Sequence, residues 1–131
     1  MLMMICLSLF AHQALTQSSG MPEGMKKYVV VLLWRGERAG DHDAEALAEI
    51  QRGHMATINR LAQEKKLVIA GPFADGGDLR GIFVLDVDSV EEAEALVAND
   101  PAVQAGRLRV ELKPWWSTDR LPELLEPRAE Q

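Results

Sequence analysis

Two short segments of this 131-residue chain are apolar at nearly every position, and they constrain the fold more than any other feature. Residues 27–34 read KYVVVLLW and residues 81–87 read GIFVLDV. Short runs rich in β-branched and aromatic residues are typical of strands that are buried on both faces. We therefore expect these two segments to be the central strands of a sheet.

A helix is predicted between these two runs from the spacing of apolar residues. Steps of three and four residues place five side chains on one helix face, after a cap at Asp41 or Asp43. Gly53 lies within this helix, where glycine costs about 1 kcal/mol relative to alanine. Gly53 indicates either a close approach to the helix backbone at this position or a position where the lower helix stability is simply tolerated. The inward stripe consists of Leu47, Ile50, His54, Ile58 and Leu61.

The remaining segments complete a βαββαβ order. Residues 67–70 predict a strand that runs into a Gly-rich turn, and Ser89 with Glu92 forms a capping box at the start of a second helix. Residues 107–113 alternate apolar and polar side chains, as expected of a strand at a sheet edge. This order predicts a ferredoxin-like α+β domain, in which an antiparallel sheet carries both helices on one face.

The predicted fold leaves an apolar sheet face without cover. Two helices can cover only one face, although the central strands are apolar on both. An apolar patch of that size is larger than a soluble monomer normally exposes. We therefore expect a homodimer in which two copies pack sheet against sheet.

Composition and motifs exclude several other classes of protein. A net charge of −6 argues against a nucleic-acid surface, which needs clustered Lys and Arg. The single cysteine, Cys6, precedes the expected domain, so a disulfide or a thiolate metal site within one chain is excluded. Asp41, His42 and Asp43 are adjacent in a loop and are interpreted as solvated residues, not as metal ligands. No P-loop, GxSxG, HExxH or GxGxxG motif is present, and no cofactor is expected.

Residues 1–24 are expected to lie outside the fold, and two interpretations of them stay open. Residues 1–11 form an apolar run of signal-peptide length, too short for a stable membrane span, and small residues at 14 and 16 fit cleavage before Gln17. This interpretation predicts an exported or periplasmic protein. Because no Lys or Arg precedes the run, translation could instead begin at Met21 or Met25, which predicts a cytoplasmic protein. The domain itself is expected over residues 25–116, followed by a tail at 117–131 that is interpreted as a frayed end in preference to a docking helix.

His54 and Asp100 are the candidate functional residues. An imidazole on the inward face of a helix needs a hydrogen-bond partner, because an unsatisfied buried polar group costs about 1–3 kcal/mol. Asp100 could be that partner, and a carboxylate fixes the imidazole tautomer, as general acid–base catalysis requires. Each residue also has a structural interpretation: His54 as a core residue bonded to a backbone carbonyl, and Asp100, which precedes Pro101, as a helix cap worth about 1 kcal/mol. The two roles of Asp100 are compatible, since a carboxylate has two oxygens.

Several motifs, in this order along the chain, resemble the YCII-related (YciI-like) family. They are His54-Met55-Ala56, LVIAGPF at residues 67–73, RGIF at 80–83, NDPAV at 99–103 and KPWW at 113–116. The resemblance covers residues 26–116. It implies a dimeric α/β barrel of ferredoxin-like protomers, with an acid–base pair in a pocket at the positions of His54 and Asp100. The best-known enzymatic branch of that family dehydrochlorinates a hydroxylated aromatic ring.

The resemblance also implies which residues lie near the substrate. It places Gly71, Pro72 and Phe73, which otherwise read as a turn at a strand end, at the rim of the pocket. Arg80 either faces an anionic ligand or protects the strand against aggregation. The aromatic pair Trp115-Trp116 indicates dimer or core packing.

One leading hypothesis and one alternative follow. The leading hypothesis is a cofactor-independent enzyme that transfers a proton on a small organic molecule, with His54 as the general acid/base and Asp100 as its orienting residue. The reaction would be an isomerisation, an elimination or a hydrolytic-type reaction. The alternative is a non-catalytic protein that binds or senses a small molecule. An enzyme needs the imidazole of His54 open to a pocket, whereas a binding or structural role tolerates a sealed one.

Overall fold

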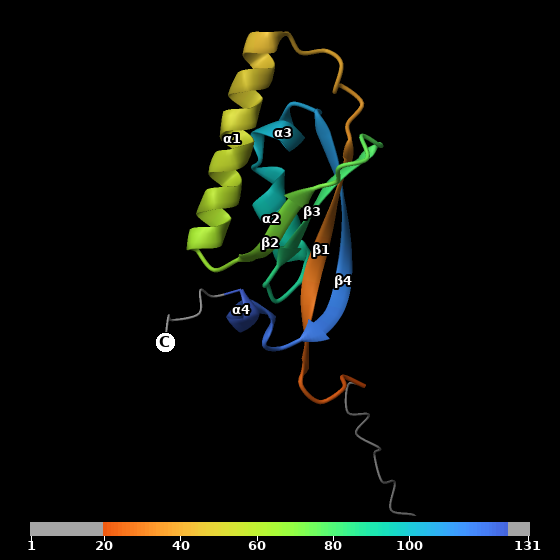
Figure 1. The fold of residues 1–131 in the computed structure, drawn as a ribbon, viewed down its shortest axis with the longest axis vertical. Helices are drawn as coiled ribbons and strands as arrows, with labels where there is room; N and C mark the ends of the chain where they lie inside the picture. Colours follow the sequence, from red (N-terminus) through yellow and green to blue (C-terminus); the bar gives the residue numbers. More distant parts are fainter. Residues whose placement is uncertain (1–19, 126–131) are drawn as a thin grey trace, which may run out of the picture.

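The two apolar runs form the central strands of an antiparallel sheet. In the computed structural model, which describes residues 20–125, they correspond to β1 (Met25–Arg35) and β3 (Leu79–Leu85). The edge strands are β2 (Leu67–Pro72) and β4 (Leu108–Thr118), and the strand order is β2-β3-β1-β4 (Figure 1). In register, Val31 of β1 lies between Phe83 of β3 and Leu112 of β4. The predicted ferredoxin-like topology is confirmed.

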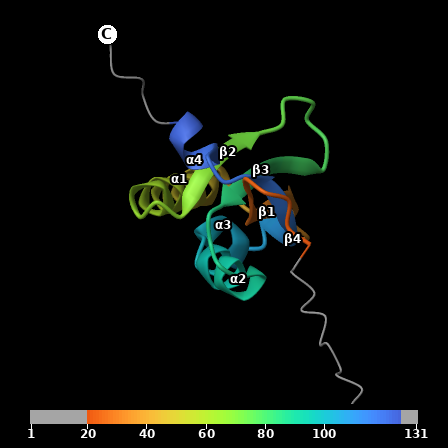
Figure 2. The same ribbon diagram turned by 90° about the horizontal axis from the view of Figure 1, so that it is seen from below.

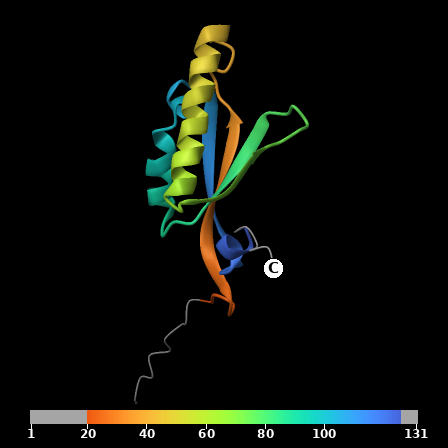
Figure 3. The same ribbon diagram turned by 60° about the vertical axis from the view of Figure 1, so that its left-hand side comes forward.

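Helices cover one face of this sheet. They are α1 (Ala44–Gln63), α2 (Val90–Ala98) and the short α3 (Pro101–Gln104). Figures 2 and 3 show all three on the same side of the strands. The hydrophobic core lies between the two layers, and its buried residues are Val29, Val31, Leu33, Leu61, Phe83, Leu85, Val87, Ala93 and Val97.

The opposite face of the sheet is apolar and carries no long helix among the described residues. Because side chains alternate along a strand, the neighbours of the core residues on β1 and β3 point to this face. Val30, Leu32 and Ile82 are half-buried there, and Ile69 of β2 is 47% exposed. We refer to these four residues as the open face.

The end of the domain extends further than the sequence predicts. The last strand was expected over residues 107–113 with a frayed tail from 117, but β4 continues to Thr118, which pairs with Met25, and α4 (Leu121–Leu124) follows. The frayed-tail prediction is therefore wrong for residues 117–124. Pro114 can lie within β4 because an edge strand tolerates a missing N–H, and the Tyr28 hydroxyl donates to the carbonyl oxygen of Thr118 at 2.7 Å.

The predicted capping box at α2 is half correct. The Ser89 hydroxyl accepts from the backbone N–H of Glu92 at 3.1 Å, as expected. The Glu92 carboxylate, however, accepts from the N–H of Asp88, one residue before the expected donor. The same carboxylate lies 2.7 Å from the ammonium group of Lys66, which ties α2 to the chain just before β2.

Predictions about Cys6 and the cleavage site concern residues outside the described part of the chain.

Candidate functional site

Helix α1 places His54 between the sheet and α3. The helix begins at the cap Asp43, whose carboxylate accepts from the N–H of Ala46 at 2.8 Å. The apolar stripe then turns His54 inward, where its ring stacks on Phe83 of β3 with centroids 5.8 Å apart and planes 21° apart. The His54 side chain keeps 13% of its surface exposed. It is therefore packed against the core without being sealed in it.

Asp100 uses its two carboxylate oxygens for two different contacts. Oδ1 accepts from the backbone N–H of Ala102 at 2.8 Å and so caps α3. Oδ2 lies 2.7 Å from Nδ1 of His54. The Asp100 side chain is only 1% exposed. The cap and the contact with the imidazole, which the sequence analysis judged compatible, thus coexist on one residue.

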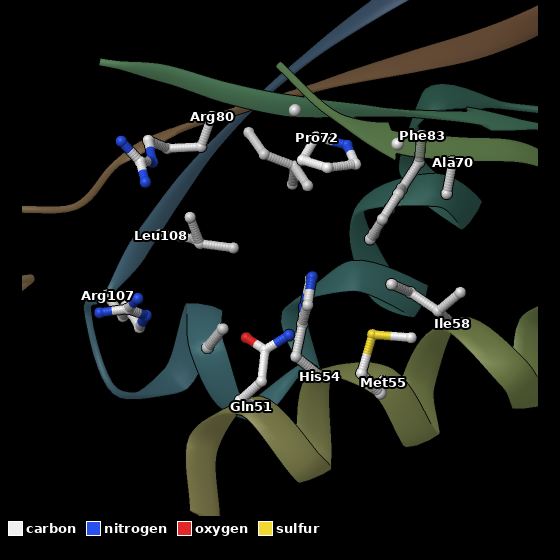
Figure 4. Close-up of a pocket in the computed structure, with 14 residues that line it drawn as sticks. Gln51, His54, Met55, Ile58, Ala70, Pro72, Arg80, Phe83, Arg107 and Leu108 are labelled. Carbon is white, nitrogen blue, oxygen red and sulfur yellow. The ribbon is translucent and has the colours of Figure 1, made fainter. Parts of the chain in front are cut away.

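This contact determines which imidazole nitrogen faces the solvent. A carboxylate only accepts hydrogen bonds, so Nδ1 of His54 carries the hydrogen that is donated to Asp100. In the neutral ring, Nε2 is then a hydrogen-bond acceptor. Figure 4 shows the end of the His54 ring pointing away from α1 into a cavity. Nε2, the ring nitrogen that can accept a proton, therefore faces the cavity.

Gly53 lies where α1 packs against the start of α3. A Cβ atom at position 53 would lie 2.5 Å from Cγ and 3.0 Å from Cβ of Pro101. Real carbon atoms do not pack at 2.5 Å, so α1 can lie this close to the start of α3 only with glycine at this position. A close approach, one of the two interpretations of Gly53, is therefore found, although the group that approaches the α1 backbone is the ring of Pro101 and not another backbone. Since His54 follows Gly53 and Asp100 precedes Pro101, this contact lies directly beside the pair.

The cavity in front of His54 has a volume of about 340 Å³, within the range of small-molecule sites. Gly71, Pro72 and Arg80, named from the sequence, line it. Phe73 does not line it: its N–H donates to the Arg80 carbonyl at the end of the hairpin, and its side chain is 45% exposed. The lining residues are Leu33, Gln51, His54, Met55, Ile58, Ala70, Gly71, Pro72, Arg80, Gly81, Phe83, Ala102, Arg107 and Leu108.

Sequence reasoning missed three polar or flexible residues of this lining. On α1, Gln51 lies three residues before His54 and four before Met55, and this helical spacing is a signal that could have found Gln51. Arg107 reaches the cavity from the loop before β4, and nothing in its local sequence indicates this.

Other candidates from the sequence lie away from the cavity. Trp115 packs against Tyr28 with ring centroids 6.2 Å apart, and Trp116 lies under the ammonium group of Lys27. Within residues 20–125, no cluster of three His, Cys, Asp or Glu side chains could hold a metal ion. Over the same residues, no helix combines the length and the apolar character needed to cross a bilayer.

Comparisons with known proteins agree with this architecture. At 38% identity over 63 residues, the chain matches the uncharacterized protein YjpA of Bacillus subtilis (strain 168), and the match covers 48% of this chain and 72% of that protein. The structure of 5-chloro-2-hydroxyhydroquinone dehydrochlorinase (TftG) from Burkholderia phenoliruptrix AC1100, in complex with 2,5-dihydroxybenzoquinone, is similar with a TM-score of 0.50. This likeness covers 69% of this chain and 93% of that one at 19% identity, and it supports the fold alone.

The family follows from a separate comparison. The family model of the YCII-related domain matches residues 29–116, which span the sheet from β1 to β4 and include both His54 and Asp100. The chain therefore belongs to the YCII-related domain family.

Proposed function

We propose that this protein is an enzyme that acts on a small organic molecule by proton transfer, with His54 as the general acid/base and Asp100 as the residue that orients it. The observation that carries the proposal is the 2.7 Å contact between Nδ1 of His54 and Asp100, made by an imidazole that also lines a cavity. A sealed imidazole would have favoured the alternative, a binding or sensor protein.

The proposed chemistry uses the free nitrogen of the imidazole. Nε2 of His54 takes a proton from a carbon or oxygen of the bound molecule, and the Asp100 carboxylate stabilises the imidazolium that forms. The proton then returns to another atom of the substrate or to a leaving group. The ring of Phe83 on one side of the imidazole limits access of water and so strengthens these electrostatic contacts.

The reaction types that fit are isomerisation, elimination and hydrolytic-type reactions at an activated ring or carbonyl. The structurally similar protein is a dehydrochlorinase bound to a dihydroxybenzoquinone. We carry over only the reaction type, an elimination, which in this proposal begins with removal of a proton by His54. No step requires a cofactor, because the imidazole and carboxylate supply both the base and its counter-charge.

Hydrogen–deuterium exchange into candidate substrates tests this proposal. Hydroxylated aromatic and carbonyl compounds are incubated with the full-length protein in D2O, and NMR measures deuterium entering carbon positions. His54→Asn should reduce the exchange rate about 10²–10⁴-fold, while the melting temperature stays near that of the wild type. His42→Asn, at a histidine that does not line the cavity, is the matched control and should leave the rate unchanged.

A structural role for His54 predicts the reverse pattern. His54→Asn would then lower the free energy of unfolding by about 1–3 kcal/mol through the disturbed hydrogen bond, with any ligand binding retained. If His54→Asn and Asp100→Asn both keep full exchange activity, the acid–base assignment is wrong. Ligand binding without exchange in the wild type would favour the sensor alternative.

The second part of the proposal is a homodimer formed through the open face. Two copies packing sheet against sheet would bury the half-buried residues of this face together with the exposed side chain of Ile69. Each 100 Å² of apolar surface removed from water contributes roughly 2.5 kcal/mol, so several hundred Å² outweighs typical association costs. Sedimentation velocity at micromolar concentration should show a dimer that Leu32→Asp converts to a monomer. A wild-type monomer under these conditions would contradict this assembly.

A further inference from the structure

Three arginines gather at one end of the cavity that holds His54. Arg80 and Arg107 line this cavity, and both also line a smaller adjoining cavity together with Arg35. We call these three residues the arginine cluster. Figure 4 shows Arg80 and Arg107 on one side of the cavity and the apolar side chains of Phe83 and Ile58 on the other. The site therefore has a cationic end and an apolar end, with the His54 ring between them.

No acidic side chain neutralises the arginine cluster in the part of the chain that the structure describes. Neither cavity has an Asp or Glu in its lining, although Asp and Glu outnumber Lys and Arg by 20 to 14 in this chain. None of the three arginines takes part in an ion pair with a described residue. Four arginines elsewhere do have carboxylate partners, namely Arg38, Arg52, Arg60 and Arg120, and Arg109 lies over the ring of Trp34.

Hydrogen bonds position the main chain at Arg107 and the guanidinium of Arg80. The Arg107 carbonyl accepts from the N–H of Gly36 at 2.8 Å, and a Cβ at position 36 would overlap the carbonyl oxygen of Gly106. At the β2–β3 hairpin, Nη1 of Arg80 donates to the carbonyl of Gly77 at 3.1 Å. A donor that is already oriented loses less conformational entropy on binding, which favours Arg80 as the first contact of a ligand.

We propose that this site binds a small organic carboxylate. The arginine cluster holds the carboxylate, because the planar guanidinium fork matches its two oxygens. The carbon skeleton lies against the apolar wall at Phe83, which a bare inorganic anion could not use. A carbon near the acid group then faces Nε2 of His54. This inference rests on the proposed function, since it specifies the substrate class of the same site.

Benzoate and its neutral analogue benzamide test the charge requirement directly. Calorimetric or NMR titration of the full-length protein should show benzoate binding at least about tenfold more tightly than benzamide, with the difference shrinking as the salt concentration rises. Arg80→Gln and Arg107→Gln should each weaken benzoate binding about tenfold and leave benzamide binding unchanged. Arg109→Gln is the matched control, because Arg109 lies over Trp34 and outside both cavities.

Three outcomes would overturn this inference. They are equal affinity for benzoate and benzamide, equal weakening by Arg109→Gln, and inorganic phosphate binding as tightly as benzoate, which would indicate a simple anion site. Benzoate binding and exchange activity are measured separately. His54→Asn should keep benzoate binding while it loses exchange activity, so a failure of the catalytic proposal can be distinguished from a failure of this inference. Arginine-dependent benzoate binding in a protein without exchange activity would support the ligand class and refute the catalytic role.

Discussion

Replacing Gly53 with alanine tests whether the approach of α1 to α3 sets the geometry of the site. The added methyl would lie 2.5 Å from Cγ of Pro101, whereas carbon atoms pack at about 3.5–4.0 Å. The two helices must therefore separate by about 1 Å at this point. The 2.7 Å contact between His54 and Asp100 would then stretch beyond the range of a useful hydrogen bond.

Two effects on stability oppose each other in this variant. Alanine is favoured over glycine in a helix interior by about 1 kcal/mol. An extra methyl forced into a packed contact costs about 1–3 kcal/mol, and losing the hydrogen bond of a half-buried pair costs about 1 kcal/mol more. We expect Gly53→Ala to lower the free energy of unfolding by about 1–3 kcal/mol despite its better helix propensity.

Urea unfolding and NMR measure the two consequences separately. Ala56→Gly, at an exposed position of the same helix, gives the propensity difference without the contact to Pro101. The double variant Gly53→Ala/Pro101→Ala removes the closest atom and should recover part of the loss, which a double-mutant cycle quantifies. The proton on Nδ1 of His54 should give a slowly exchanging NMR signal in the wild type that is lost in Gly53→Ala.

The opposite result would refute the reasoning. If Gly53→Ala raised the free energy of unfolding by about 1 kcal/mol, as propensity alone predicts, and kept the Nδ1 proton signal, the glycine would only be tolerated. The distance between His54 and Asp100 would then have to be set by other contacts.

Three further predictions concern stability. The hydrogen bond from Lys66 lowers the pKa of the Glu92 carboxyl. The ionised Glu92 carboxylate therefore stabilises the fold at pH values above the ordinary pKa of 4.5, and this stabilisation is lost as the pH falls through the lowered pKa. Glu92→Gln should have a lower urea midpoint than the wild type at neutral pH and an equal midpoint in strong acid. Tyr28→Phe removes the donor to the Thr118 carbonyl and should cost about 0.5–1.5 kcal/mol, measured by thermal unfolding. Gly36→Ala places a methyl against a backbone carbonyl oxygen, which cannot rotate away, and should cost about 3 kcal/mol in the same assay.

The central part of the fold could be predicted because its signals are local. The runs in β1 and β3 are apolar on both faces, and only strands between other strands need that pattern. The end of β4 could not be predicted in the same way. Its last residues do not alternate, and Pro114 normally argues against a strand. Pairing with β1 supplies the stabilisation that the local sequence lacks.

The same difference between local and long-range signals applies to the residues of the candidate site. The helical period turns His54 inward and the Asp-Pro pair marks a cap, so both residues stand out in the sequence. The arginine cluster does not, because its members lie at the ends of three different segments. Register brings them together: Arg35 pairs with Leu108, the neighbour of Arg107, beside the start of β3. Contacts of this kind depend on strand pairing, which no local pattern encodes.

The double use of Asp100 explains why Asp100→Asn is an informative test of the proposed chemistry. The asparagine oxygen can keep the cap on α3, so the fold should persist. Its amide group then faces His54 in place of Oδ2, and an amide nitrogen donates where the carboxylate accepted. Nδ1 must therefore become the acceptor, and Nε2 carries the hydrogen into the cavity. A neutral ring in that tautomer presents a donor to the substrate and cannot act as a base, although every side chain is still in place.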